Sequence, residues 1–126
     1  NNFTENTYYL NNYINLDLVW NTGIGFGLFS SNSDIIYNLT SLLIIMVIIC
    51  LIYFLIRSEK YEKIIYSIIV GGALGNFYDR IFFKAVPDFI DLHYKNFHWF
   101  TFNLADIFIT LGIIAFLFKE IFKANQ

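Results

Sequence analysis

The chain has 126 residues and a formal net charge of −2, with 57% hydrophobic and only 14% charged residues. That apolar excess is too large for an ordinary soluble domain of this length. The small negative charge and the lack of a Lys/Arg cluster in the sequence exclude a nucleic-acid partner. Cys50 is the one cysteine and sits in an apolar run, so we expect a buried side chain and neither a disulfide framework nor a cysteine metal site.

The beginning of the chain predicts an extracytoplasmic β segment over residues 1–33. The first residue is Asn1 rather than Met, and no apolar signal segment follows it, so we expect that an upstream segment is missing. Residues 13–20 alternate between apolar and polar side chains, which is typical of a half-buried strand. Asn21-Thr22-Gly23 then predicts a turn that leaves the Asn21 amide available as donor and acceptor, and a plain turn is the alternative. The apolar set of the strand is Ile14, Leu16, Leu18 and Trp20.

Three apolar runs predict transmembrane helices over residues 34–56, 63–80 and 103–122, because about 20 such residues cross a hydrocarbon core. Basic residues gather at helix ends on one side of the predicted bundle, and that side should be cytoplasmic. Residues 1–33 and a loop over 81–102 then lie on the extracytoplasmic side. The basic residues are Arg57, Lys60, Lys63, Lys119 and Lys123.

The predicted outer loop is rich in aromatic residues. Its run over 97–102 either pairs with the strand at 13–20 or forms a belt at the membrane surface. His93 and His98 are five positions apart in this loop, which supplies too few ligands for a metal site, so none is expected. Asp91 is expected to be a solvated loop charge.

The second predicted helix carries small residues at Gly71, Gly72 and Gly75, which allow a neighbouring helix or a ligand to approach closely. Helix packing alone is the alternative. The polar residues that follow share one helix face and either organise a network or mark the interfacial end of the span. They are Asn76, Asp79 and Arg80.

Two carboxylates bracket the outer loop, Asp88 near its start and Asp106 in the first turn of the third helix. A carboxylate at a helix centre in the membrane costs on the order of 2.5–3.5 kcal/mol, so it needs a partner or a function. If the two meet, they share one proton and can activate a water molecule as an aspartyl hydrolase does. The alternatives are a turn role for Asp88 after Pro87, and a capping box in which Asn103 is the N-cap and Asp106 the N3 carboxylate.

Four motifs occur in order along the chain: Asn-x-Gly-x-x-Phe-Gly at 21–27, Gly-Gly-Ala-Leu-Gly-Asn-x-x-Asp-Arg at 71–80, Val-x-Asp-Phe at 86–89 and Phe-Asn-x-Ala-Asp at 102–106. Together they resemble the bacterial lipoprotein signal peptidase family, also called signal peptidase II. The resemblance implies a mainly α, integral membrane fold in one domain over 1–126, with three of the family's four transmembrane helices and a small extracytoplasmic β-cradle. The family's first helix has no counterpart here, and Pro87 stands where a β-branched residue is usual.

The resemblance also assigns roles to individual residues. It implies an intramembrane aspartyl endopeptidase whose catalytic pair is Asp88 and Asp106, with Asp79 in a structural polar shell. The implied substrate-binding residues are Asn21, Gly72, Asn76, Arg80 and Asn103.

The implied substrates are diacylglyceryl-modified prolipoproteins, cleaved before the lipidated cysteine, and the implied partners are membrane lipid and a globomycin-type cyclic peptide inhibitor. We expect a monomer in the bacterial cytoplasmic (inner) membrane, multi-pass, with the active site at the extracytoplasmic face and no metal or organic cofactor. The alternatives are a proton-relay or transport component and a structural membrane subunit. A relay would distribute charges through the membrane depth, and residues 35–56 and 107–118 contain none.

Overall fold

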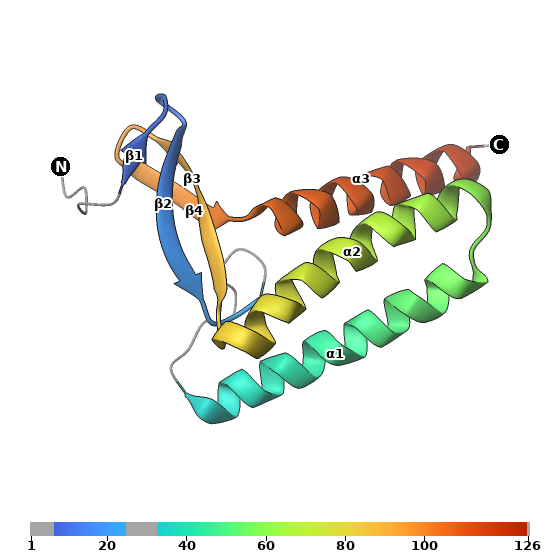
Figure 1. Ribbon diagram of the computed structural model, residues 1–126. Coiled ribbons are helices and arrows are strands. Elements are labelled where there is room, and N and C mark those ends of the chain that lie inside the picture. Colours follow the sequence, from blue (N-terminus) through green and yellow to red (C-terminus); the bar gives the residue numbers. More distant parts are fainter. Residues whose placement is uncertain (1–6, 25–32, 126) are drawn as a thin grey trace. The chain divides into compact units, whose positions relative to one another are not determined.

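The computed structural model describes residues 7–24 and 33–125, and the chain divides into two compact units. The sheet unit comprises Asn1–Thr40 and Asp79–Asn103, and the helical unit comprises Ser41–Tyr78 and Leu104–Gln126. The elements follow one another in the order β1, β2, α1, α2, β3, β4, α3 (Figure 1).

The sheet unit contains a four-stranded antiparallel sheet in the order β1-β2-β3-β4 (Figure 1). Because β3 is a central strand, it pairs on one edge with a strand from the start of the chain and on the other with the strand that follows it. Both pairings contain a register shift. The strands are β1 (Tyr8–Tyr9), β2 (Ile14–Asn21), β3 (Val86–Tyr94) and β4 (Phe97–Phe102).

The half-buried strand predicted at 13–20 is confirmed as β2, and its buried residues are polar, Asn15 and Asn21. Leu18 and Trp20 are 55% and 51% exposed, whereas Asn15 is 1% exposed. Asn15 stands opposite Asp91 of β3, and both residues line one pocket. In a soluble protein, the polar side chains of an alternating strand face water and the apolar ones face the core. This rule does not apply where apolar side chains can contact lipid.

The segment 81–102, expected as a loop, contains the β3–β4 hairpin. Of the two alternatives for the aromatic run 97–102, pairing with the strand at 13–20 is wrong, because this run forms β4 and pairs with β3. We missed β3 because Val86–Tyr94 contains Pro87 and two acids, which are depleted in strands. Pro87 is only the second residue of β3, where a missing N–H disturbs the ladder least.

The three predicted helices are present; the second extends three residues further at each end than predicted, and the other two differ by one or two residues. They are α1 (Asp34–Arg57), α2 (Lys60–Phe83) and α3 (Leu104–Ala124). Within residues 7–24 and 33–125, one helix, α1, meets both the length and the composition of a membrane span. Charged residues near the ends of α2 and α3 set these two helices apart from α1, and their membrane crossing stays a prediction.

Within the helical unit, α2 and α3 approach closely at two glycines. A Cβ atom added to Gly72 would lie 2.8 Å from the Ala105 carbonyl oxygen and 2.8 Å from Ile109 Cγ1. A Cβ atom added to Gly112 would lie 2.4 Å from Ile69 Cγ1. The glycines therefore allow a contact between helices that larger residues would prevent. Cys50 of α1 is exposed, so the expectation that it would be buried is wrong.

Candidate active site

Among the described residues of the sheet unit, Asp88 is the most enclosed carboxylate, with 2% of its surface exposed. It lies near the start of β3, opposite Val19 of β2. Asn21 Nδ2 donates to Asp88 Oδ2 at 3.1 Å, and Asn103 Nδ2 donates to Asp88 Oδ1 at 2.8 Å. Each carboxylate oxygen therefore has its own amide donor, one from the last residue of β2 and one from the residue after β4.

Asn21 also shapes the turn that follows β2. Its Oδ1 accepts a hydrogen bond from the Gly23 N–H at 2.8 Å, and its Nδ2 donates to the Ile24 carbonyl at 2.7 Å. This is the side-chain-to-backbone bonding that makes Asn favourable in turns. One buried amide, 5% exposed, thus joins the turn to the carboxylate.

Arg80 is the buried cation of the sheet unit, with 3% exposed. Its guanidinium donates to the carbonyl oxygens of Thr22, at 3.1 Å, and Gly23. Asp88 is among the charges that attract it. Arg80 therefore holds the same turn as Asn21 and places positive charge in the neighbourhood of the carboxylate.

Asp106 is the corresponding acid of the helical unit and is 4% exposed. Asn76 Nδ2, from α2, donates to Asp106 Oδ1 at 3.0 Å. Because α3 begins at Leu104, Asp106 occupies its first turn, where the positive end of the helix dipole favours a carboxylate. Gly72 lies beside the same turn and contacts Ala105 and Ile109, which supports the helix-packing alternative for this glycine.

Asn103 and Asp106 occupy the positions that the capping alternative requires, because Asn103 directly precedes α3 and Asp106 is its third residue. However, both side chains also bond beyond the helix, Asn103 to Asp88 and Asp106 to Asn76. A role restricted to capping would not require those two contacts.

The predicted residues therefore fall into two clusters. The sheet unit brings Asn21, Arg80, Asp88 and Asn103 together, and the helical unit brings Gly72, Asn76 and Asp106 together. Asp79 is half-buried on α2. Phe26 and Gly27 of the first motif lie outside the described residues.

The expectation for Asp91 is wrong, because it is a buried residue of β3 and not a solvated loop charge. It is 5% exposed, and its Oδ2 lies 2.6 Å from Nδ1 of His98. Sequence reasoning missed this pairing because the hairpin was not predicted. The signal was present in the alternation of Asp91 and His93, which point to the same face of a strand.

Asparagine side-chain amides donate to both active-site candidates, Asn21 and Asn103 to Asp88 and Asn76 to Asp106. Such donors fix the direction of a carboxylate without forming an ion pair. A buried carboxylate with this environment is suited to general acid–base chemistry.

The sequence profile of the family described as "Signal peptidase (SPase) II" matches residues 1–122. A lipoprotein signal peptidase from Pelagibacter ubique is 48% identical over 118 residues, which cover 94% of this chain and 71% of the relative. The lipoprotein signal peptidase from Anaplasma phagocytophilum is 47% identical over 117 residues, covering 90% of this chain and 73% of the relative.

Two solved structures of bacterial membrane enzymes, determined by the in meso method, have similar folds. One, at 2.3 Å resolution, has a TM-score of 0.78 and 26% identity, covering 94% of this chain and 73% of the enzyme. The other, at 1.9 Å, has a TM-score of 0.70 and 28% identity, covering 90% and 74%. With the family profile matching nearly the whole chain, these similarities lead to one conclusion: the chain belongs to the signal peptidase II family.

Proposed function

We propose that this protein removes the signal peptide from diacylglyceryl-modified prolipoproteins, cleaving before the lipidated cysteine with Asp88 and Asp106 as an aspartyl pair. Membership of a peptidase family supports proteolysis, and the names of the relatives support a lipoprotein substrate. The observation that carries the choice of residues is the burial of both acids among amide donors.

The chain itself connects the two acids. Asn103, which donates to Asp88, precedes Asp106 by only three residues. A segment of this length reaches at most about 11 Å even when fully extended. This short connection supports the proposal that both carboxyl groups act on one substrate.

In the proposed mechanism, one carboxylate takes a proton from a water molecule held between the pair, and the hydroxide adds to the scissile carbonyl carbon. The other carboxyl group is protonated and hydrogen-bonds to the carbonyl oxygen. The C–N bond then breaks, and the carboxyl that received the proton of the water gives it to the departing amine of the lipidated cysteine. No metal or organic cofactor takes part in this sequence.

The remaining polar residues position the substrate in this proposal. Asn21, Asn103 and Arg80 hold peptide carbonyls, Asn76 holds Asp106, and Gly72 keeps α2 close to α3. Asp79 belongs to the surrounding polar shell. The lipid of the substrate lies against the exposed apolar side chains of the helices, which suits a site at the extracytoplasmic edge of the cytoplasmic membrane.

A proton relay is disfavoured by α1, which has no charged residue between its terminal Asp34 and Arg57. A structural subunit would not need two buried carboxylates with amide donors, because each such group is costly to desolvate. We therefore keep peptidase activity as the proposed function.

The test is cleavage of a diacylglyceryl-modified lipobox peptide by the purified protein in detergent. The proposal predicts a product that begins with the lipidated cysteine, no cleavage of the unlipidated peptide, and inhibition by globomycin. Equal cleavage of both peptides, or cleavage at another bond, would contradict the proposed substrate.

A further inference from the structure

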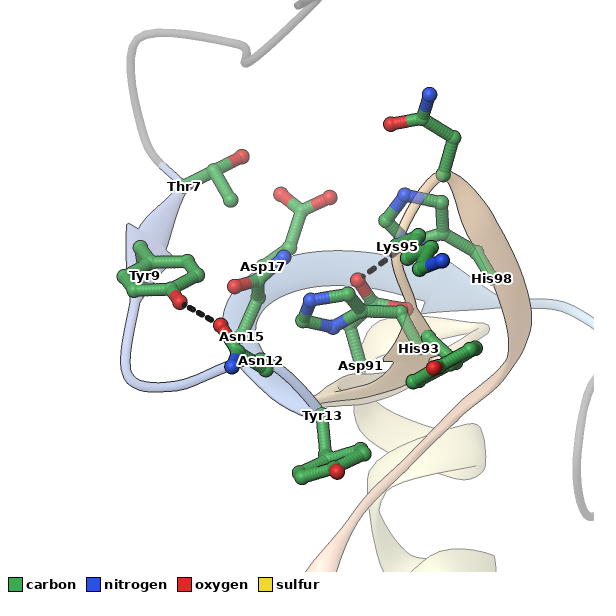
Figure 2. A pocket seen from close by; sticks show the side chains of 12 residues that line it. Thr7, Tyr9, Asn12, Tyr13, Asn15, Asp17, Asp91, His93, Lys95 and His98 are labelled. Atoms are coloured by element: carbon green, nitrogen blue, oxygen red, sulfur yellow. Dashed lines mark hydrogen bonds and ion pairs between the residues drawn. The ribbon is translucent and has the colours of Figure 1, made fainter.

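A second group of acid and imidazole side chains lies on the sheet, on the face of β3 opposite Asp88. Asp91 and His93 belong to β3, and His98 belongs to β4. One ligand atom from each of the three side chains lies within 4.8 Å of the others. Figure 2 shows the three side chains converging in one pocket, with the contact between Asp91 and His98 drawn as a dashed line.

Strand geometry explains why these three residues meet. Asp91 and His93 are two positions apart and therefore project from the same face of β3. His98 is the register partner of His93 across the hairpin, and their rings stack at 5.3 Å between centroids. The register shift between Leu92 and His93 brings His98 within 2.6 Å of Asp91 as well.

Two buried polar atoms in this pocket have no hydrogen-bond partner among the described residues. They are Nδ1 of His93, whose residue is 7% exposed, and Oδ1 of Asn15, whose residue is 1% exposed. Buried polar atoms in native structures nearly always have a partner, so two such atoms lining one pocket indicate an occupant that supplies it.

We propose that Asp91, His93 and His98 bind a divalent transition-metal ion, with Zn²⁺ as the principal candidate. Two imidazoles and one carboxylate form a donor set used by zinc and by other first-row metals that retain open coordination positions. Ligand atoms of a tetrahedral zinc site lie about 3.3 Å apart, given Zn–N bonds of roughly 2.0–2.1 Å. The ligand atoms that lie up to 4.8 Å apart must therefore approach by about 1.5 Å, while the 2.6 Å contact between Asp91 and His98 opens. The exposed His98 can make both adjustments by rotating.

The pocket leaves room for the remaining coordination positions. Its volume of about 870 Å³ is far larger than an ion, so water can complete the metal shell. Asn15 faces Asp91 across the β2–β3 pairing, and its free Oδ1 is suited to accept a hydrogen bond from metal-bound water. Of the other charged residues that line the pocket, Asp17 attracts a cation and Lys95 opposes it.

A metal at this position would join β3 to β4 close to their turn, and the proposal does not depend on peptidase activity. The two histidines are the only ones in the chain, so imidazole ligation of a metal by this protein can be assigned without ambiguity. The role we infer is stabilisation of the sheet unit, because an ion that binds the folded state alone raises its stability.

The test uses tag-free protein, stripped with a chelator and titrated with Zn²⁺ in competition with a chromophoric chelator. We expect one Zn²⁺ to bind per chain and to raise the temperature of thermal unfolding. Co²⁺ bound at the same site should show the visible d–d absorption that is typical of a low coordination number. His98→Gln should weaken zinc binding by at least about 100-fold and abolish that rise. Its side chain is 53% exposed, so this variant should still fold without zinc.

Two matched variants serve as controls. Asp17→Asn removes a carboxylate from the same pocket but outside the ligand set, and Cys50→Ser removes the one thiol. Both should bind zinc within a few-fold of the parent. Binding below one equivalent, or equal affinity in His98→Gln and the parent, would overturn the metal site and leave the Asp91–His98 contact as a simple pair that links two strands.

Discussion

Two buried aspartates on β3 have opposite surroundings. Asp88 and Asp91 are three residues apart, so they project from opposite faces of the strand, and they are 2% and 5% exposed. Asp88 receives neutral amide hydrogen bonds from Asn21 and Asn103, whereas Asp91 contacts an imidazole.

The difference shows how partners decide what a buried acid can do. The amide donors orient the carboxylate of Asp88, which we propose as a catalytic group. The imidazole of His98 instead holds Asp91 in a contact between the two strands of the hairpin. One strand thus presents an acid suited to chemistry on one face and an acid suited to binding on the other.

The largest expected effect is the loss of cleavage when Asp88 or Asp106 is replaced. Asp88→Asn and Asp106→Asn should each reduce cleavage of the lipidated peptide by at least about 100-fold, because each removes a group that exchanges a proton with the reacting atoms. The isosteric amides should leave the unfolding transition nearly unchanged. Asp34→Asn, at an exposed position, is the control and should cleave as the parent does. Near-parental cleavage by either active-site variant would remove that residue from the pair.

On the other face of β3, we expect the opposite result, a loss of stability with cleavage retained. Asp91→Asn should lower the free energy of unfolding by about 1–3 kcal/mol, because the buried contact with His98 is lost. Cleavage measured well below the unfolding midpoint should stay within a few-fold of the parent. If this variant lost activity as completely as Asp88→Asn while remaining folded, the assignment of chemistry to one face of the strand would be wrong.

A third prediction concerns the helix contact beside Asp106. Gly72→Ala should destabilise the helical unit by about 1–3 kcal/mol, because its Cβ would meet the Ala105 backbone carbonyl. Gly71→Ala is a matched control, since no atom lies within 4 Å of an added Cβ there, and it should be neutral or stabilising. Denaturant titration in detergent measures both. Equal stability of the two variants would show that the close approach at Gly72 is not present in solution.

The smallest expected effect comes from the amides that hold the two acids. Asn103→Ala and Asn76→Ala each remove one donor, from Asp88 and Asp106 respectively, and should lower kcat about 3- to 10-fold while KM changes less. These residues act by positioning, so Asn103→Gln, with a longer amide, should recover little. A change confined to KM would indicate that the amides contact the substrate alone.

The helices and their order could be predicted from the sequence because long apolar runs with charged ends have few alternatives. The strand at 13–20 also followed from alternation. The β3–β4 hairpin could not be predicted, because Pro87, Asp88 and Asp91 are of residue types that are depleted in strands. The strand β3 is stabilised by pairing on both of its edges, which local sequence does not reveal. The residues near Asp88 come from three separate parts of the chain, so their grouping depended on the resemblance and not on spacing.

The burial of Asn15 was also beyond local sequence reasoning. Its burial depends on pairing with Asp91, which is 76 positions away in the chain, and on the pocket that both residues line. The same holds for the metal proposal, because His93 and His98 form a ligand set with Asp91 only when the hairpin places them across from each other.

The most direct test of the central claim compares Asp88→Asn, Asp106→Asn and the double variant in the same cleavage assay. Residues that act as one unit are strongly non-additive. If the two carboxyl groups form one pair, the double variant should be no slower than either single variant. A double variant slowed by the product of the two single effects would show that Asp88 and Asp106 act independently, and would contradict a shared aspartyl pair.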